Sequence, residues 1–289
     1  MPNAVEPPSE SPRTLADVLD LLAQRGGAWR PVAGGTDLMV QIAGEIGDPP
    51  DGILDIWALD ELRGIAVEDG ALVIGALTTY TEIRHSPVVA EVMPALAEAA
   101  ATIGAAQIQN RGTVGGNVVN ASPAGDTLPL LLATDSVMVL ASTRGERSVA
   151  SSEFWPAYRT IARADDELLV RIRIPLVARR EVRFRKVGTR RAQAISKVVM
   201  ALAWRTEDDA AEWRDVRLAL GSVAATTIRV PAAEATLEGA APTRETAGAA
   251  ADALAAAITP IDDVRSTADY RRAVAARVLH RLVRDEGGW

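Results

Sequence analysis

The 289-residue sequence contains no cysteine. Without a thiol, the chain can form neither a disulfide nor a thiolate-ligated iron–sulfur cluster. It also lacks an excess of basic residues, because 31 Lys and Arg residues stand against 38 Asp and Glu residues, a formal net charge of −7. Proteins that bind nucleic acid usually present a basic surface. The composition therefore argues against a nucleic-acid-binding protein and against a chain that carries its own iron–sulfur cluster.

Two common phosphate-binding patterns are missing as well. No two glycines are separated by a single residue, which excludes the Rossmann fingerprint, and no lysine follows a glycine, which excludes a P-loop. The two histidines, His85 and His280, lie far from any cluster of metal-ligating residues in the sequence, so we expect no metal site. A nucleophile–base arrangement for hydrolysis is not visible either.

Membrane and export signals are also absent from the sequence. No apolar run is long enough to cross a bilayer. The first twelve residues contain acidic residues and prolines but neither the basic nor the apolar region of a secretory signal. We therefore expect a cytoplasmic protein without a membrane span.

The hydrophobic pattern predicts a folded chain of alternating helices and strands. Hydrophobic residues make up 48% of the sequence, enough for real cores in a chain of this length. A helix is expected after Thr14, ending at Gly26-Gly27, and another over 94–102. The alanine-rich sequence after Pro231 favours packed helices, the last over 270–285. The expected strands cover 30–33, 53–56, 71–77, 136–140, 168–174, 197–205 and 216–223.

Two glycine-rich turns are the most informative features that are present. They cover Ala33-Gly34-Gly35-Thr36-Asp37 and Arg111-Gly112-Thr113-Val114-Gly115-Gly116-Asn117. Glycine has no Cβ, so paired glycines let the main chain adopt positive φ and come within hydrogen-bond distance of an anion. Both turns lead into segments of regular structure, and a helix N-terminus favours a bound anion. The two turns together predict a cradle for a dinucleotide pyrophosphate. The alternative is that the glycine pairs only form tight turns.

Three segments carry a resemblance to one family. They are Pro31–Leu38, Thr102–Asp126 and Phe184–Val198. The first two resemble the FAD-binding loops of the medium, flavoprotein subunit of molybdenum hydroxylases, the family of xanthine dehydrogenase, aldehyde oxidase and carbon monoxide dehydrogenase. The third resembles the start of that family's C-terminal domain. The three matches occur in family order and span most of the chain.

The resemblance implies a mixed α/β (α+β) fold with a two-lobed FAD-binding domain of the PCMH type and a smaller C-terminal α+β domain. The C-terminal domain is expected to hold a three-stranded sheet with helices. We expect the first lobe over 1–60, the second lobe over 61–178 and the C-terminal flavoprotein domain over 179–289. The prolyl segment 175–180, which breaks a strand pattern, is the candidate linker.

The resemblance also assigns a set of cofactor-binding residues. They are Ala33, Gly34, Gly35, Thr36, Asp37, Leu38, Ile103, Gly112, Thr113, Gly115, Gly116, Asn117, Ser122, Asp126, Leu169 and Lys186. A carboxylate beside phosphates repels them, so we expect Asp37 to cap the following helix with its side chain. Ser122 and Asp126 correspond to family positions near the ribityl and ribose hydroxyls; turn chemistry around Pro123 and Gly125 is the alternative.

Lys186 corresponds to a family lysine near the flavin ring, where a cation would stabilise the negative charge of the reduced flavin. Its alternative is membership of a solvated or interfacial basic patch, because arginines surround it between 179 and 191. Neither glycine run contains His or Cys, so we expect FAD to be held non-covalently. No catalytic residue is expected beyond the flavin itself.

As a member of this family, the chain would take electrons from two-iron two-sulfur clusters on a small subunit. It would pass them through FAD to NAD or another acceptor, while a large subunit carries the molybdopterin. A dimer of heterotrimers is the implied assembly. Two alternatives are a stand-alone FAD-dependent oxidase or reductase of a related fold and a non-catalytic assembly scaffold. The organic substrate, the final acceptor, the oligomeric state in isolation and the role of the 179–191 basic cluster are not specified by the sequence.

Overall fold

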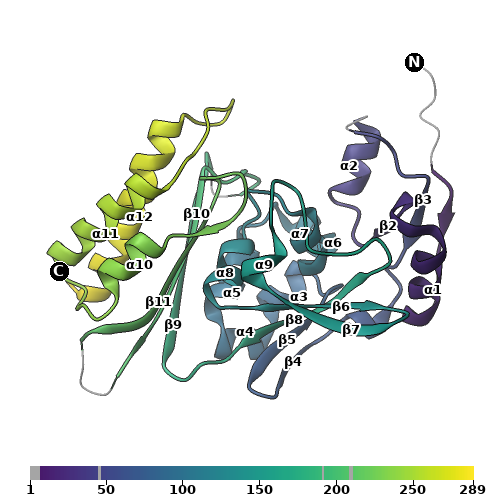
Figure 1. Ribbon diagram of the computed structural model, residues 1–289, viewed down its shortest axis with the longest axis horizontal. Coiled ribbons are helices and arrows are strands. Elements are labelled where there is room, and N and C mark those ends of the chain that lie inside the picture. The colour runs from purple at the N-terminus through teal and green to yellow at the C-terminus, as the bar shows by residue number, and fades with distance from the viewer. Residues whose placement is uncertain (1–6, 45–46, 191, 208–210) are drawn as a thin grey trace.

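The computed structural model describes residues 7–44, 47–190, 192–207 and 211–289 (Figure 1). Inferences drawn above from residues 1–6 and from Arg191 lie outside this part of the chain. Every strand predicted from the sequence is present, with ends displaced by at most three residues. Among the described residues, no helix is both long and apolar enough to cross a membrane.

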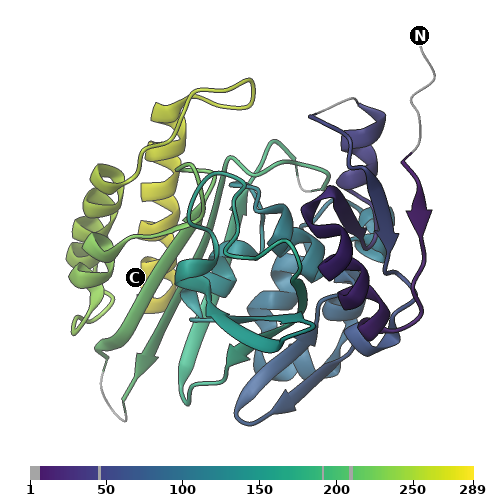
Figure 2. The same cartoon turned by 45° about the vertical axis from the view of Figure 1, so that its right-hand side comes forward.

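A small parallel sheet opens the chain. Its strand order is β1-β3-β2, with β1 at Ser9–Glu10, β2 at Trp29–Val32 and β3 at Gly52–Asp55. Helix α1 (Leu15–Arg25) covers this sheet, as Figure 2 shows with both in front. The Thr14 hydroxyl accepts a hydrogen bond from Asp17 N and Gly26 ends the helix, which confirms the predicted limits. The first glycine turn leaves β2 and leads into α2 (Leu38–Ala43).

A five-stranded antiparallel sheet follows, in the order β4-β5-β8-β6-β7. The strands are β4 (Ile65–Glu68), β5 (Ala71–Gly75), β6 (Val137–Ser142), β7 (Gly145–Ala150) and β8 (Leu168–Pro175). The helices between and after them are α3 (Tyr80–His85), α4 (Pro87–Val92), α5 (Pro94–Ala101), α6 (Ala106–Arg111), α7 (Val114–Asn120), α8 (Leu128–Ala133) and α9 (Ser151–Phe154). The second glycine turn joins α6 to α7.

The remaining sheet is antiparallel, with the order β12-β11-β10-β9. It contains β9 (Arg180–Val187), β10 (Val198–Thr206), β11 (Trp213–Gly221) and β12 (Ile228–Arg229). We expected three strands here; the two-residue β12 adds a fourth. Three helices cover the outer face, α10 (Pro231–Leu237), α11 (Arg244–Ala257) and α12 (Ala268–Gly287), shown in yellow-green in Figure 1.

The central strand β10 is buried on both faces, which explains its unbroken apolar sequence. Met200 and Leu202 pack with the three outer helices, whereas Val199 and Ala201 join the core that also holds α5 and α8. Alternate side chains of a strand point to opposite faces, so one strand serves two cores. Helices α5 and α8 therefore lie between the five-stranded and the four-stranded sheets (Figure 1).

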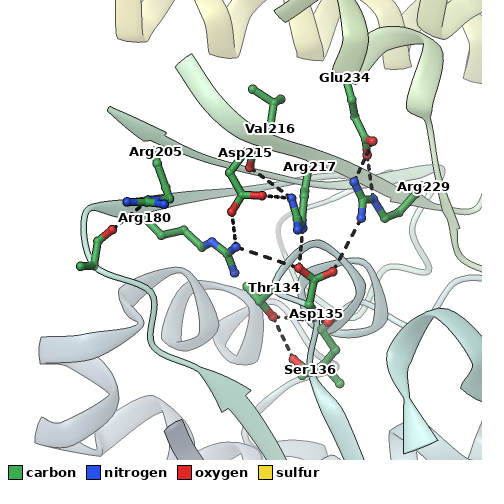
Figure 3. A network of polar contacts seen from close by, with 12 residues as sticks. Thr134, Asp135, Ser136, Arg180, Arg205, Asp215, Val216, Arg217, Arg229 and Glu234 are labelled. Atoms are coloured by element: carbon green, nitrogen blue, oxygen red, sulfur yellow. Dashed lines mark hydrogen bonds and ion pairs between the residues drawn. The ribbon is translucent and has the colours of Figure 1, made fainter. Parts of the chain in front are cut away.

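A charged network joins the end of α8 to the four-stranded sheet (Figure 3). Asp135 pairs with Arg217, and its carboxylate lies 3.6 Å from the Arg229 guanidinium and 4.0 Å from that of Arg180. Asp215 of β11 bridges Arg180 and Arg217. Burial raises the pKa of Asp215, but the hydrogen bond from Arg180 and the charge of Arg217 outweigh that effect and hold it below its ordinary value.

Replacing Asp215 with asparagine is expected to lower the free energy of unfolding at pH 7 by about 1–2 kcal/mol, because two charge-assisted hydrogen bonds are weakened. The lowered pKa means that this contribution is complete above the ordinary carboxyl range near pH 4 and is lost as the pH falls through the folded-state pKa. Urea denaturation across pH should show the two proteins converging in acid. Asp269→Asn is the control, since Asp269 is 97% exposed; equal losses in both variants would contradict the prediction.

Candidate functional site

The two glycine turns line one cavity of about 510 Å³. The first turn forms one wall, and the second turn with the start of α7 forms another. Of the residues assigned to the cofactor from the sequence, all except Ser122, Asp126 and Lys186 line this cavity, including Ile103 and Leu169 from elsewhere in the chain. Two loops about 80 residues apart thus meet at a single site.

The first turn is pressed against the second at Gly34. A Cβ at this position would lie 1.7 Å from the carbonyl oxygen of Arg111, so only glycine fits. Gly35 has φ +73°, a left-handed conformation that glycine adopts without strain. The glycine pair therefore serves both close approach and turn geometry.

The first turn also has unused hydrogen-bond donors at residues that line the cavity. Within the described part of the chain, the N–H groups of Gly34, Gly35 and Thr36 donate to no protein acceptor. Successive main-chain N–H groups in such a turn form an anion-binding concavity. This arrangement fits the diphosphate of a dinucleotide.

The second turn differs from its expected form, because its N–H groups are largely used within the protein. Gly115 N donates to Ala76 O at 2.9 Å, and Gly116 N donates to the Thr113 hydroxyl at 3.1 Å. A Cβ at Gly115 would lie 2.6 Å from Ala76 O, so this glycine permits close packing on Ala76, the residue directly after β5. Both glycines line the cavity, but a Cβ at Gly116 would have only the Thr113 hydroxyl within 4 Å. The second turn therefore offers a ligand few free N–H donors, but a main chain that the ligand can approach closely at Gly116.

The expected helix-capping role of Asp37 is wrong. Asp37 has αR backbone angles (φ −110°, ψ −50°) and its side chain makes no capping hydrogen bond, because an N-cap residue needs an extended conformation. Its carboxylate instead accepts from Asn120 Nδ2 at 3.1 Å, and Asn120 Oδ1 accepts from Arg159 at 3.1 Å. Burial raises the pKa of Asp37, opposed by the charge of Arg159. A relay of three side chains therefore links the first turn to α7.

Ser122 and Asp126 lie outside the cavity lining. The Ser122 hydroxyl accepts from Ala124 N at 3.3 Å, a contact of the turn itself. Asp126 is buried and pairs with Lys186 at 2.6 Å. It also accepts a hydrogen bond from the Ser196 hydroxyl, which is 1% exposed.

Lys186 is buried, so it does not belong to a solvated patch. Its ammonium group donates to Asp126 and to Thr102 O at 2.9 Å, directly before Ile103 in the cavity wall. Burial raises the pKa of Asp126, and the charge of Lys186 opposes that rise. Neighbouring arginines of β9 have separate partners: Arg183 pairs with Glu181 and Glu286.

Sequence reasoning missed several cavity residues. Asn120 lies in the Thr102–Asp126 segment that resembles the family, but its place opposite Asp37 depends on the fold. Arg159, with positive φ of 50°, and Arg30 bring cationic groups to the lining. Tyr80 is 2% exposed, and burial together with the nearby Asp126 charge raises its pKa above the usual range despite a hydrogen bond with Thr127. Arg30, Tyr80 and Arg159 belong to no motif that the sequence showed.

Two family models match the chain. Residues 6–177 match the FAD-binding domain in molybdopterin dehydrogenase, and residues 183–285 match the C-terminal domain of the carbon monoxide dehydrogenase flavoprotein. Together the two matches cover nearly the whole sequence.

Individual proteins are similar over their full length. The carbon monoxide dehydrogenase medium chain of Hydrogenophaga pseudoflava is 34% identical over 278 residues, 94% of each chain. The xanthine dehydrogenase FAD-binding subunit of Escherichia coli O157:H7 is 32% identical over 282 residues, 95% of each chain. A solved structure of the Hydrogenophaga carbon monoxide dehydrogenase superposes with a TM-score of 0.90 at 33% identity, covering 95% of each chain. Quinoline 2-oxidoreductase from Pseudomonas putida 86 gives a TM-score of 0.90 at 26% identity, covering 98% of this chain and 97% of that one.

Proposed function

The chain belongs to the FAD-binding medium subunits of the molybdenum hydroxylase family, and on that premise we propose that it binds FAD non-covalently between its two glycine turns and transfers electrons through it. The relatives are named dehydrogenases, so the family activity is that of an oxidoreductase. The observation that carries the proposal is the row of unpaired N–H groups at Gly34, Gly35 and Thr36, three residues that line a cavity bounded by the second turn.

The groups that line the cavity suit a dinucleotide. The free donors of the first turn would hold the pyrophosphate, and Gly116 leaves room for it on the opposite wall. Asp37 would repel phosphate, but it is tied through Asn120 to the Arg159 cation. Apolar side chains such as Ile103 and Leu169 complete the lining. Bound FAD would supply the redox chemistry, while the protein orients it and sets its potential.

Lys186 would influence the flavin from behind the wall. Its ammonium group lies at Thr102 O, next to Ile103, and is neutralised in part by Asp126. A fixed cation at this place would stabilise the negative charge that the flavin gains on reduction. We extend the proposal to a division of the chain at residues 60 and 178, between two cofactor-binding lobes and a C-terminal domain.

The source and the destination of the electrons complete the proposal. The chain has no cysteine to ligate an iron–sulfur cluster, so electrons would arrive from two-iron two-sulfur clusters on a small subunit. A large subunit would carry molybdopterin, in a dimer of heterotrimers in the cytoplasm. NAD or another acceptor would take the electrons from the flavin.

The absorption spectrum of the purified chain tests the cofactor. We expect flavin bands, and one equivalent of FAD released on denaturation and identified by chromatography. Release without proteolysis would agree with non-covalent binding. A folded chain that stays colourless after incubation with FAD would overturn the proposal and favour a non-catalytic scaffold. A flavoprotein that turns over a substrate without partner subunits would favour the stand-alone oxidase or reductase.

A further inference from the structure

A tryptophan next to a residue of the cavity lining contacts arginines from two other segments. Trp57 lies two residues after β3 and next to Ile56, which lines the cavity. The guanidinium carbon of Arg111 lies 3.8 Å from the centroid of the Trp57 ring, and that of Arg63 lies 4.4 Å from it. Both distances are well within the range of cation–π contacts. Two arginines from separate segments thus stack on one indole.

Arg63 fixes the tryptophan to the second lobe. Its guanidinium donates to Leu77 O at 2.9 Å and to Trp57 O at 2.8 Å, and its side chain is only 20% exposed. Two main-chain carbonyls, one from each lobe, are therefore joined through one arginine. A side chain held at both ends in this way loses little further freedom when it stacks on the ring.

Arg111 connects the tryptophan to the second glycine turn. It is the last residue of α6 and directly precedes Gly112. Its carbonyl oxygen is the atom against which Gly34 is packed. Within the described residues its guanidinium makes no hydrogen bond or ion pair, so the indole is its specific contact. The main chain of Arg111 thus meets the first turn, while its side chain meets the loop that follows β3.

We propose that Trp57 is a positioning residue for the cofactor: by holding Arg111, it fixes the separation of the two glycine turns. The inference rests on the proposed function, since it concerns the affinity of the FAD cradle. A binding site whose walls are held in place loses less entropy when the ligand binds. The contact between Trp57 and Arg111 is therefore expected to strengthen FAD binding although Trp57 does not contact FAD.

The test is an FAD titration of the ligand-free full chain, followed by flavin fluorescence, together with thermal melting of the ligand-free protein. Trp57→Ala is expected to raise the Kd for FAD by about five- to thirtyfold, the effect of losing two cation–π contacts of about 0.5–1 kcal/mol each. Trp57→Phe keeps an aromatic face and should restore the Kd to within about threefold of the original. Arg111→Gln removes the same contact from the other side. Because the Arg111 side chain is exposed, this variant is expected to fold even if Trp57→Ala does not.

The matched control is Arg25→Ala. It removes another guanidinium stacked on a tryptophan, at 4.4 Å from the Trp29 ring, but both partners belong to the first lobe. Its FAD affinity should not change. If Arg111 acts through Trp57, the double variant Trp57→Ala/Arg111→Gln should bind FAD no more weakly than the weaker single variant.

The outcomes separate the two claims. An original chain that does not bind FAD overturns the proposed function. If it binds FAD, an unchanged Kd in folded Trp57→Ala or Arg111→Gln overturns the positioning role alone. Additive losses in the double variant would also overturn it, because Arg111 would then act on the pyrophosphate charge independently of the indole. A change in the melting temperature of Trp57→Ala without a change in its Kd for FAD would mean that Trp57 stabilises the fold and does not position the cofactor site.

Discussion

Gly116→Val is expected to abolish stoichiometric FAD binding while the chain stays folded. Gly116 lines the cavity, and a Cβ built on it would meet only the Thr113 hydroxyl, at 3.0 Å. The valine methyl groups would therefore occupy cavity space instead of colliding with the core. The expected rise in Kd is about a hundredfold or more, equivalent to about 2.7 kcal/mol of binding free energy.

Gly248→Val provides a matched control for this experiment. Gly248 lies in α11, and no atom lies within 4 Å of a Cβ at that position. Both substitutions place valine for glycine in a helix, so their effects on helix propensity are similar. Circular dichroism would establish folding, and the flavin-to-protein absorbance ratio would report binding. A folded Gly116→Val protein with a full complement of FAD would show that the second turn is not a wall of the cofactor site.

The choice of Gly116 illustrates what sequence reasoning resolves in a glycine turn. The spacing of glycines located both turns, since only residues without a Cβ permit such close approach. Both Gly115 and Gly116 line the cavity, and the spacing did not show that a Cβ would collide with Ala76 O at Gly115 but would have room at Gly116. That difference depends on which neighbour lies against each α-carbon, and at Gly115 the neighbour is Ala76, the residue directly after β5.

The strands show the same limit. The buried strand β8 has apolar residues that alternate with arginines, and its position was predicted correctly. Strand β7 was missed because it is exposed on nearly every residue, so its sequence has no apolar alternation. Strand β9 was read as a basic cluster, although Phe184 is buried and Arg180 and Arg183 pair with separate carboxylates. Burial on one face was visible in the sequence, whereas ion pairing across the chain was not.

Replacing Lys186 with methionine is expected to destabilise the chain by about 3–5 kcal/mol, because the substitution leaves a buried carboxylate without its counter-charge. Asp126 is 7% exposed and 60 residues away in sequence, so only the fold reveals the pair. Methionine keeps most of the lysine's apolar length, which limits the loss of packing. Urea denaturation of the full chain measures the change.

The double variant Lys186→Met/Asp126→Asn separates the lost charge from lost packing. An asparagine is neutral and its side-chain oxygen still accepts from Ser196, so the double variant should recover most of the stability, to within about 2 kcal/mol of the original chain. After the stability measurements, the rate of flavin reoxidation per bound FAD should be measured for each variant. A reoxidation defect without any loss of stability would contradict the structural role of the pair.

The pH dependence of the single variant gives an independent check. Burial raises the pKa of Asp126, and removal of Lys186 takes away the charge that opposes this rise. The folded variant therefore binds a proton more readily than the unfolded chain does, and its stability must fall as the pH rises between the two pKa values. The penalty is complete above the raised pKa and disappears toward the ordinary carboxyl range near pH 4. A penalty of equal size at pH 4 and pH 8 would mean that lost packing, and not an unpaired carboxylate, destabilises the variant.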